Sequence, residues 1–134
     1  MTGGEFVMPN TSVVIDRSLL DVWSFLADKC NWKAWHGATL VSVEPGWQSG
    51  ATLVWEDGSS SNLEACVARK LIRLGTRFMS RGYELIPIGD STELRYFFEA
   101  RGGASFSDKG AAHLASYEKN LRRLKQLLED ARRE

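Results

Sequence analysis

The segment KGAAHLASYEKNLRRLKQLLEDARRE, residues 109–134, decides how the chain folds. Its apolar residues recur at intervals of three and four, the spacing of an α-helix with one apolar face. These residues are Leu114, Tyr117, Leu121, Leu124 and Leu128, and charged side chains occupy most of the other positions. Alone, such a helix would leave its apolar face in water, so we expect the rest of the chain to cover it.

Upstream of this helix, apolar and polar side chains alternate over much of residues 39–101, as in an antiparallel sheet with one buried face. We expect five strands joined by short turns, with the ranges 39–44, 51–56, 63–73, 77–86 and 92–101. In the last strand, Leu94, Tyr96 and Phe98 alternate with charged residues. Phe97, on the charged side, is the exception to this pattern.

The N-terminal part of the chain predicts one strand and two short helices. TSVVID, residues 11–16, is short and rich in β-branched residues, as strands are. Ser18 is a suitable N-cap for the helix that follows, and Gly37 suits the end of a second helix over residues 28–37. The order is therefore a strand, two helices, five strands and a long helix, which indicates an α+β fold.

Length and composition narrow the class of protein. A chain of 134 residues is expected to form a single domain, residues 1–134. Its 17 basic and 17 acidic residues balance, which argues against nucleic acid as a partner. Two cysteines make no disulfide framework, and neither a signal-peptide pattern nor an apolar run of about 18 residues occurs. We therefore expect a cytoplasmic protein without a membrane span.

Four segments carry a family resemblance: TSVVID at residues 11–16, SLLDVWSFLAD at 18–28, NWKAW at 31–35 and LRRLKQLLED at 121–130. They resemble the START-like proteins, also called the Bet v 1-like, SRPBCC or polyketide cyclase/dehydrase superfamily. The resemblance implies a helix-grip fold, in which a curved antiparallel sheet of six or seven strands wraps around the C-terminal helix. It also implies an apolar cavity between sheet and helix. Such proteins mostly bind lipids, sterols, polyketides or other hydrophobic molecules, and some are cyclases, hydrolases or co-chaperones.

The pairing of the last two strands decides which of their side chains face inward. Placing Tyr83 opposite Tyr96 also places Glu84 opposite Arg95, which sets unlike charges together on the outer face. In this register Arg81 points inward, where a guanidinium group needs a partner. That partner could be a carboxylate of the protein or an acidic group of a ligand; otherwise Arg81 lies near the strand end and reaches water. A shift by one residue would reverse the assignment.

The candidates for the wall of a ligand cavity are Trp35, Leu53, Trp55, Arg81, Tyr83, Tyr96, Phe98 and Tyr117. Ligand pockets are usually apolar and aromatic with a few placed polar groups, here Arg81 and the tyrosine hydroxyls. The same aromatic residues could equally fill a core. No metal-ligand cluster, phosphate-binding glycine motif or nucleophile motif occurs, so no metal or cofactor is expected and catalytic residues are unknown. His36 and His113 are interpreted as packing or surface residues.

Three functions fit these patterns. The first is a binding protein that holds a small hydrophobic ligand of the lipid, polyketide or aromatic type. The second is a cyclase or dehydratase, in which Arg81 and the tyrosines polarise a carbonyl or move a proton; no paired carboxylate or His/Asp couple supports it. The third is a co-chaperone-like interaction module, with Phe97 and Trp47 as its hints. Whether the chain forms a homodimer is open.

Overall fold

The computed structural model describes residues 10–77, 79–100 and 110–131. The strands in these residues are β1 (Asn10–Ile15), β2 (Leu40–Glu44), β3 (Thr52–Trp55), β4 (Ser60–Val67), β5 (Leu71–Gly75), β6 (Met79–Ile88) and β7 (Ser91–Ala100). The helices are α1 (Leu19–Leu26), the short 3-10 helix η1 (Lys29–Asn31), α2 (Trp32–His36) and α3 (Gly110–Ala131).

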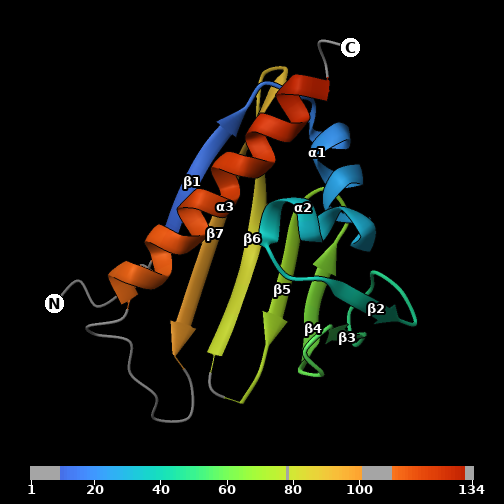
Figure 1. Ribbon diagram of the computed structural model, residues 1–134. Helices are drawn as coiled ribbons and strands as arrows, with labels where there is room; N and C mark the ends of the chain where they lie inside the picture. The colour runs from blue at the N-terminus through green and yellow to red at the C-terminus, as the bar shows by residue number, and fades with distance from the viewer. Residues whose placement is uncertain (1–9, 78, 101–109, 132–134) are drawn as a thin grey trace, which may run out of the picture.

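The seven strands form one antiparallel sheet in the order β1-β7-β6-β5-β4-β3-β2. The long helix α3 crosses one face of this sheet, and α2 packs beside it (Figure 1). A curved antiparallel sheet that holds a long C-terminal helix is the helix-grip form of the α+β class, which confirms the predicted fold.

The apolar face of α3 lies against the sheet, as the spacing of its residues predicts. Tyr117, Leu121, Leu124 and Leu128 are buried, and Leu114 packs half-buried at the edge of the core. Burying one leucine side chain completely contributes about 1.5–3 kcal/mol. This helix face is therefore a large part of what holds the two layers together.

The short helices begin and end where their capping residues allow. The side chain of Ser18 accepts a hydrogen bond from the backbone amide of Asp21 at 3.2 Å, so Ser18 caps α1 as predicted. The second predicted helix is only partly α-helical, because the chain first makes the 3-10 turn η1 and α2 begins at Trp32. The end at Gly37 is confirmed, and its φ of 85° is one that glycine adopts without strain.

One predicted strand was wrong: residues 63–73 form parts of two strands, β4 and β5, instead of one. The chain turns between them at residues 68–70, where the backbone amide of Lys70 donates to the carbonyl of Val67 at 3.0 Å. Arg69 takes the left-handed conformation that closes this turn, with φ of 62°. Neither glycine nor proline marks the turn, so the sequence pattern runs through it unbroken.

The predicted register of the last two strands is confirmed. Tyr83 pairs with Tyr96, and Glu84 pairs with Arg95. On the outer face the Arg95 guanidinium lies 3.7 Å from the Glu84 carboxylate and 3.0 Å from that of Glu93. The side chains of Arg81 and Tyr83 therefore face α3.

Phe97 breaks the alternation of β7 because a glycine lies beside it on the outer face. Gly82 pairs with Phe97, and a Cβ atom on Gly82 would clash with the Phe97 ring and with the carbonyl oxygen of Ile72. The ring thus occupies the space that a side chain at position 82 would take, and it is only 9% exposed. An aromatic residue on the charged side is accommodated without being displayed to water.

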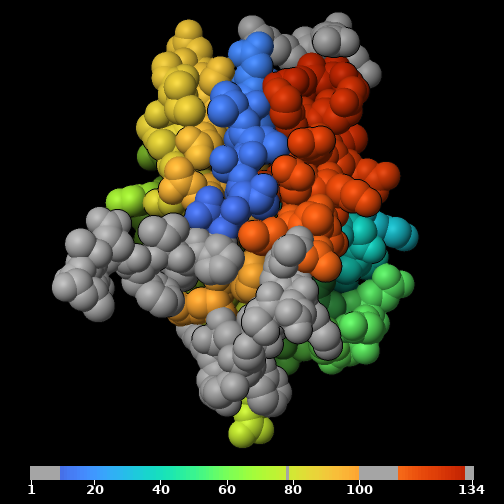
Figure 2. Space-filling model, turned by 90° about the vertical axis from the view of Figure 1, so that its left-hand side faces the viewer, coloured from blue at the N-terminus to red at the C-terminus, as the bar shows by residue number. Residues whose placement is uncertain are grey.

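At each edge strand of the sheet, a lysine of a neighbouring helix donates a hydrogen bond to a backbone carbonyl. Lys125 of α3 donates to the carbonyl of Val14 in β1 at 2.8 Å, and Lys29 of η1 donates to that of Val41 in β2 at 2.8 Å. In Figure 2, the edge strand β1 (blue) lies between α3 (red) and the neighbouring strands of the sheet (yellow and orange). Each edge is thus occupied at one of the carbonyls that another strand would use.

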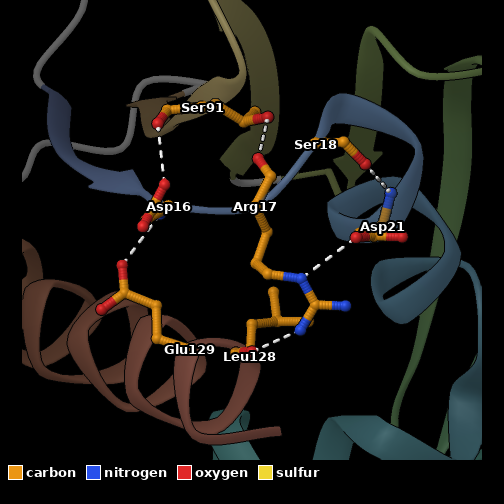
Figure 3. A network of polar contacts seen from close by, with 8 residues as sticks. Asp16, Arg17, Ser18, Asp21, Ser91, Leu128 and Glu129 are labelled. Atoms are coloured by element: carbon orange, nitrogen blue, oxygen red, sulfur yellow. Dashed lines mark hydrogen bonds and ion pairs between the residues drawn. The ribbon is translucent and has the colours of Figure 1, made fainter. Parts of the chain in front are cut away.

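A network of polar contacts fixes the C-terminal part of α3 to the sheet (Figure 3). Arg17, between β1 and α1, pairs with the carboxylate of Asp21 at 3.0 Å and donates to the backbone carbonyl of Leu128. That carbonyl belongs to the last turn of α3, where helix carbonyls lack partners and a cation is favourable.

Further contacts complete the same network. The backbone amide of Asp16 donates to the carboxylate of Glu129 at 2.8 Å, and the hydroxyl of Thr92 donates to the carbonyl of Arg17 at 3.0 Å. Ser91 donates to the carboxylate of Asp16 at 3.4 Å. We call this group, comprising Asp16, Arg17, Asp21, Ser91, Thr92, Leu128 and Glu129, the α3 anchor.

Candidate ligand-binding site

A pocket of about 640 Å³ opens at the end of β6 opposite the α3 anchor. Its wall comes from residues 36–39 at the end of α2, the β3–β4 turn, the end of β5 and the start of β6. Trp55, Leu74 and Met79 supply apolar surface, and Arg81 supplies a positive charge. A volume of this size lies within the range of roughly 300–1,000 Å³ that small-molecule sites occupy.

Arg81 is half-buried in the wall and is held there by two aromatic side chains. Its Nη1 donates a hydrogen bond to the hydroxyl of Tyr117 at 3.0 Å, and its Cζ lies 6.0 Å from the ring centre of Trp55. Within residues 10–77, 79–100 and 110–131, no carboxylate pairs with Arg81. The sequence left open that Arg81 pairs with a carboxylate of the protein. The described residues contain no such pair.

His36, the last residue of α2, lies in the pocket wall beside Arg81. Its ring stacks on Trp55, with centres 5.2 Å apart, and meets Tyr117 edge-on at 5.6 Å. The Nδ1 atom is buried and makes no hydrogen bond with any described residue. Burial and the charge of Arg81 lower the pKa of His36 to about 4, so the imidazole is neutral near pH 7.

Behind Arg81, two tyrosines form a stacked pair between the sheet and α3. The rings of Tyr96 and Tyr117 are 4.0 Å apart and nearly parallel, and the Tyr96 hydroxyl lies 2.7 Å from Nε2 of His113. Burial raises the pKa of Tyr96 and lowers that of His113. Both groups are therefore neutral near pH 7. Arg81 is the charged group that acts on the pKa of each.

Two further polar atoms of this aromatic cluster are buried without a hydrogen bond to any described residue: Nε1 of Trp35 and the hydroxyl of Tyr83. The two rings meet edge-on with centres 5.5 Å apart. Burial raises the pKa of Tyr83 well above its usual value, so its hydroxyl stays protonated. With Nδ1 of His36, three unpaired polar atoms thus lie in the layers at and behind the pocket.

The structure separates the eight predicted site residues into two groups. Trp55 and Arg81 line the pocket. The other six are buried in the core: Trp35, Leu53, Tyr83, Tyr96, Phe98 and Tyr117. Of these, Tyr117 contacts the pocket wall through its hydrogen bond to Arg81. The described pocket thus lies nearer the start of β6 than the predicted cavity does. Tyr117 of α3 lies behind the pocket wall, in contact with Arg81.

Both histidines pack among aromatic rings, one of the two interpretations of the sequence, but their position at and behind the pocket was not predicted. Trp32, Trp35 and His36 are spaced i, i+3 and i+4 on α2, so one helix face carries all three. His113 stands four residues before Tyr117 on the apolar stripe of α3. The spacing could have placed both imidazoles among the aromatic residues.

The two hints of an aromatic docking face do not form one. Phe97 packs over Gly82, and Trp47 is partly buried and stacks on Trp32 with ring centres 5.9 Å apart. Among the described residues, no group of three metal-ligating side chains occurs. Nor is any described helix long and apolar enough to cross a membrane.

A helix-grip sheet with a pocket beside the end of α2 and the start of β6 is the architecture of the START-like class of ligand-binding domain. The family model described as polyketide cyclase / dehydrase and lipid transport matches residues 10–129. The chain belongs to this family, which confirms the predicted superfamily. No curated protein matches the sequence.

Solved structures of low sequence identity share the fold. One is a protein from Staphylococcus saprophyticus, with 16% identity, a TM-score of 0.72 and coverage of 92% of both chains. A protein from Bacillus halodurans has 10% identity, a TM-score of 0.71 and coverage of 92% of this chain and 97% of its own. The Aha1 dimer from Colwellia psychrerythraea has 16% identity, a TM-score of 0.69 and the same two coverages. Such likenesses concern the fold alone.

Proposed function

We propose that this protein binds a small hydrophobic molecule of the lipid, polyketide or aromatic type in the pocket between α2 and the open end of the sheet. The observation that carries the proposal is the combination, in the described part of one wall, of apolar surface from Trp55, Leu74 and Met79 with the cationic group of Arg81. Apolar surface provides most of the affinity for such a ligand, and few placed polar groups orient it.

The test is native mass spectrometry of the purified protein, before and after denaturation and extraction. A small molecule that is bound at first and lost on denaturation supports the proposal, and its mass begins to identify the class. Ala38 lines the pocket, whereas Ala34 is exposed on α2 outside it. Ala38→Trp should therefore abolish the complex and Ala34→Trp should keep it. A complex that survives Ala38→Trp would place the ligand elsewhere.

A second candidate function is catalysis of the cyclase or dehydratase type, and His36 is the observation in its favour. A neutral imidazole beside Arg81 and Tyr117 has the arrangement of a general base next to groups that stabilise an enolate oxygen. In such a step His36 takes a proton from the carbon next to a carbonyl. The electron pair moves to the carbonyl oxygen, which Arg81 stabilises.

Exchange of α-hydrogens of a β-keto ester with deuterated water, followed by NMR, tests this second candidate. His36→Gln should remove exchange above the uncatalysed rate. His113→Gln, in the layer behind Arg81, should keep it. Equal exchange by wild type and His36→Gln would exclude His36 as the base.

We also propose a cellular location and an assembly state for this protein. Cys30 and Cys66 are free, which suits the reducing cytoplasm. The Colwellia structure is of a dimer, and a homodimer is the corresponding proposal for this chain. Light scattering behind size exclusion distinguishes a dimer from a monomer of 15.0 kDa.

A further inference from the structure

The charge of Arg81 is the feature of the pocket that its neighbours leave uncompensated. The side chain is half-buried, and among the described residues it contacts the hydroxyl of Tyr117 and the indole ring of Trp55. A cation partly removed from water costs free energy unless an anion is near it. No carboxylate of the described residues pairs with Arg81, so within this part of the chain its charge is left for a ligand to balance.

The guanidinium group also keeps hydrogen-bonding capacity. It has five N–H donors in a planar fork, and the described residues take one bond, from Nη1 to Tyr117. The fork matches the two oxygens of a carboxylate, which bind it through two parallel hydrogen bonds. Since Arg81 lines the pocket, its free donors are available to a molecule held there.

Two acidic residues of the pocket wall bear on which anion the pocket can hold. Glu56 and Asp57 are exposed in the wall, and hydrogen bonds from the hydroxyl and the amide of Ser59 lower the pKa of Asp57. Both carboxylates repel an incoming anion in proportion to its charge. His36 is neutral and adds no compensating charge near pH 7. Attraction to Arg81 also grows with the charge of the ligand, but the cost of removing a dianion from water grows more steeply, and this wall offers one described cation against two carboxylates. A single negative charge is therefore favoured over a double one.

The walls beside Arg81 suit an apolar or aromatic body. The Trp55 ring is near both the guanidinium group and the His36 ring, and Leu74 and Met79 add apolar surface to the same wall. An acid with its carboxylate on Arg81 would place the rest of its skeleton along these side chains.

We infer that the ligand of this pocket is a monocarboxylic acid with an apolar or aromatic body, and that Arg81 binds its carboxylate. The inference rests on the proposed function and adds to it the charge, the chemical group and the binding residue. A phosphate monoester, which carries up to two negative charges, is disfavoured by the same wall.

Calorimetry with matched probes tests the charge. One set is 2-naphthoate, 2-naphthamide and 2-naphthyl phosphate, and the other is octanoate, octanamide and octyl phosphate. In each set the acid should bind about 10-fold to 100-fold more tightly than the amide, the usual worth of a hydrogen bond to a charged group. The phosphate should bind more weakly than the acid. An amide or phosphate that binds as tightly as the acid would overturn the inference.

Variants test the residue. Arg81→Gln should reduce the preference for acid over amide to about 1 and leave the affinity for the amide nearly unchanged, because only the charge contact is lost. Arg81→Lys should retain part of the preference. Arg123→Gln, which removes an exposed charge from α3, should retain all of it. An acid preference that survives Arg81→Gln would contradict the assignment.

Two controls separate this inference from the proposed function. Amide bound without any acid preference would refute the inference and keep the proposed function, whereas no binding of any probe would count against both. If Arg81→Gln does not fold, ¹⁵N NMR of the arginine side chains in the wild type gives the answer. The Arg81 Nε signal should shift on addition of 2-naphthoate and stay in place with 2-naphthamide; an unmoved signal with the acid would overturn the inference.

Discussion

The polar groups near the two ends of β6 differ in how many hydrogen-bond and ion-pair partners they have. At the α3 anchor, Arg17 has both a carboxylate and a helix carbonyl as partners. At the pocket, Arg81 has a neutral hydroxyl, and polar atoms of Trp35, His36 and Tyr83 are buried without hydrogen bonds to described residues. A buried polar atom left without a partner costs about 1–3 kcal/mol. The first arrangement stabilises the fold, whereas the second leaves polar groups at and behind the proposed ligand site without partners among the described residues.

A substitution midway between the two ends sets the scale for the comparison. Leu121 is fully buried on α3, and Leu121→Ala should lower the free energy of unfolding by about 2–5 kcal/mol, because it leaves a cavity. Leu127→Ala on the same helix removes a side chain that is 36% exposed and should cost much less. Urea unfolding followed by circular dichroism measures both. Equal costs would mean that the stripe does not hold the layers together.

The pocket end should weaken the fold as the pH falls. The pKa of His36 is about 4 in the folded protein and near 6.5 when unfolded, so the unfolded state takes up the proton first. Stability should therefore fall between about pH 6.5 and pH 4, by up to roughly 3 kcal/mol. Arg81 from β6, Tyr117 from α3, and Glu56 and Asp57 in the pocket wall are the titratable or charged groups nearby.

Urea titrations at pH 7 and pH 4.5 measure this loss. His113 has a lowered pKa as well, and it contributes with the same sign. His36→Gln should remove much of the pH dependence, and His113→Gln should remove a smaller part. If His36→Gln follows the wild-type curve, the buried imidazole is not its source.

At the anchor, Arg17→Met should cost about 2 kcal/mol of stability, because a charged hydrogen bond to the last turn of α3 and the pair with Asp21 are lost. Binding of 2-naphthoate should stay within two-fold of wild type, since the anchor and the pocket lie at opposite ends of β6. Urea unfolding and calorimetry give the two numbers. Loss of binding without loss of stability would reverse the roles assigned to the two ends.

The matching change at the pocket should have the smallest effect on stability. Arg81→Met removes a half-buried charge that no described carboxylate compensates, so the free energy of unfolding should change by less than about 1 kcal/mol in either direction. The acid preference should disappear. A stability loss as large as that of Arg17→Met would show that Arg81 is a structural residue, and the contrast between the ends would fail.

Sequence patterns predicted the parts of this molecule that depend on one buried face. The α3 stripe and the pairing of Tyr83 with Tyr96 were correct, because a shift in either would expose apolar groups or oppose like charges. The turn around Arg69 was missed, because its left-handed backbone is set by tertiary structure in a stretch with no glycine.

The candidate site was predictable in part for the same reason. Alternation along β6 pointed Arg81 inward, and the structure places it in the pocket wall. Which of the aromatic residues pack in the core and which line a pocket depends on how far the sheet closes over α2 and α3. Composition and spacing do not carry that information. His36 was overlooked because its neighbours, Trp55 and Tyr117, come from distant parts of the chain.

The two lysines that hydrogen-bond to the outermost strands affect the behaviour of concentrated solutions of this protein. A free strand is a template on which further chains add their own strands, and repeated addition produces fibrils. The ammonium groups of Lys29 and Lys125 occupy carbonyls on the two margins where growth would begin. Neutralising both, as in Lys29→Gln/Lys125→Gln, should make concentrated solutions bind thioflavin T sooner than wild type. Unchanged kinetics would mean that the neighbouring helices alone protect the margins.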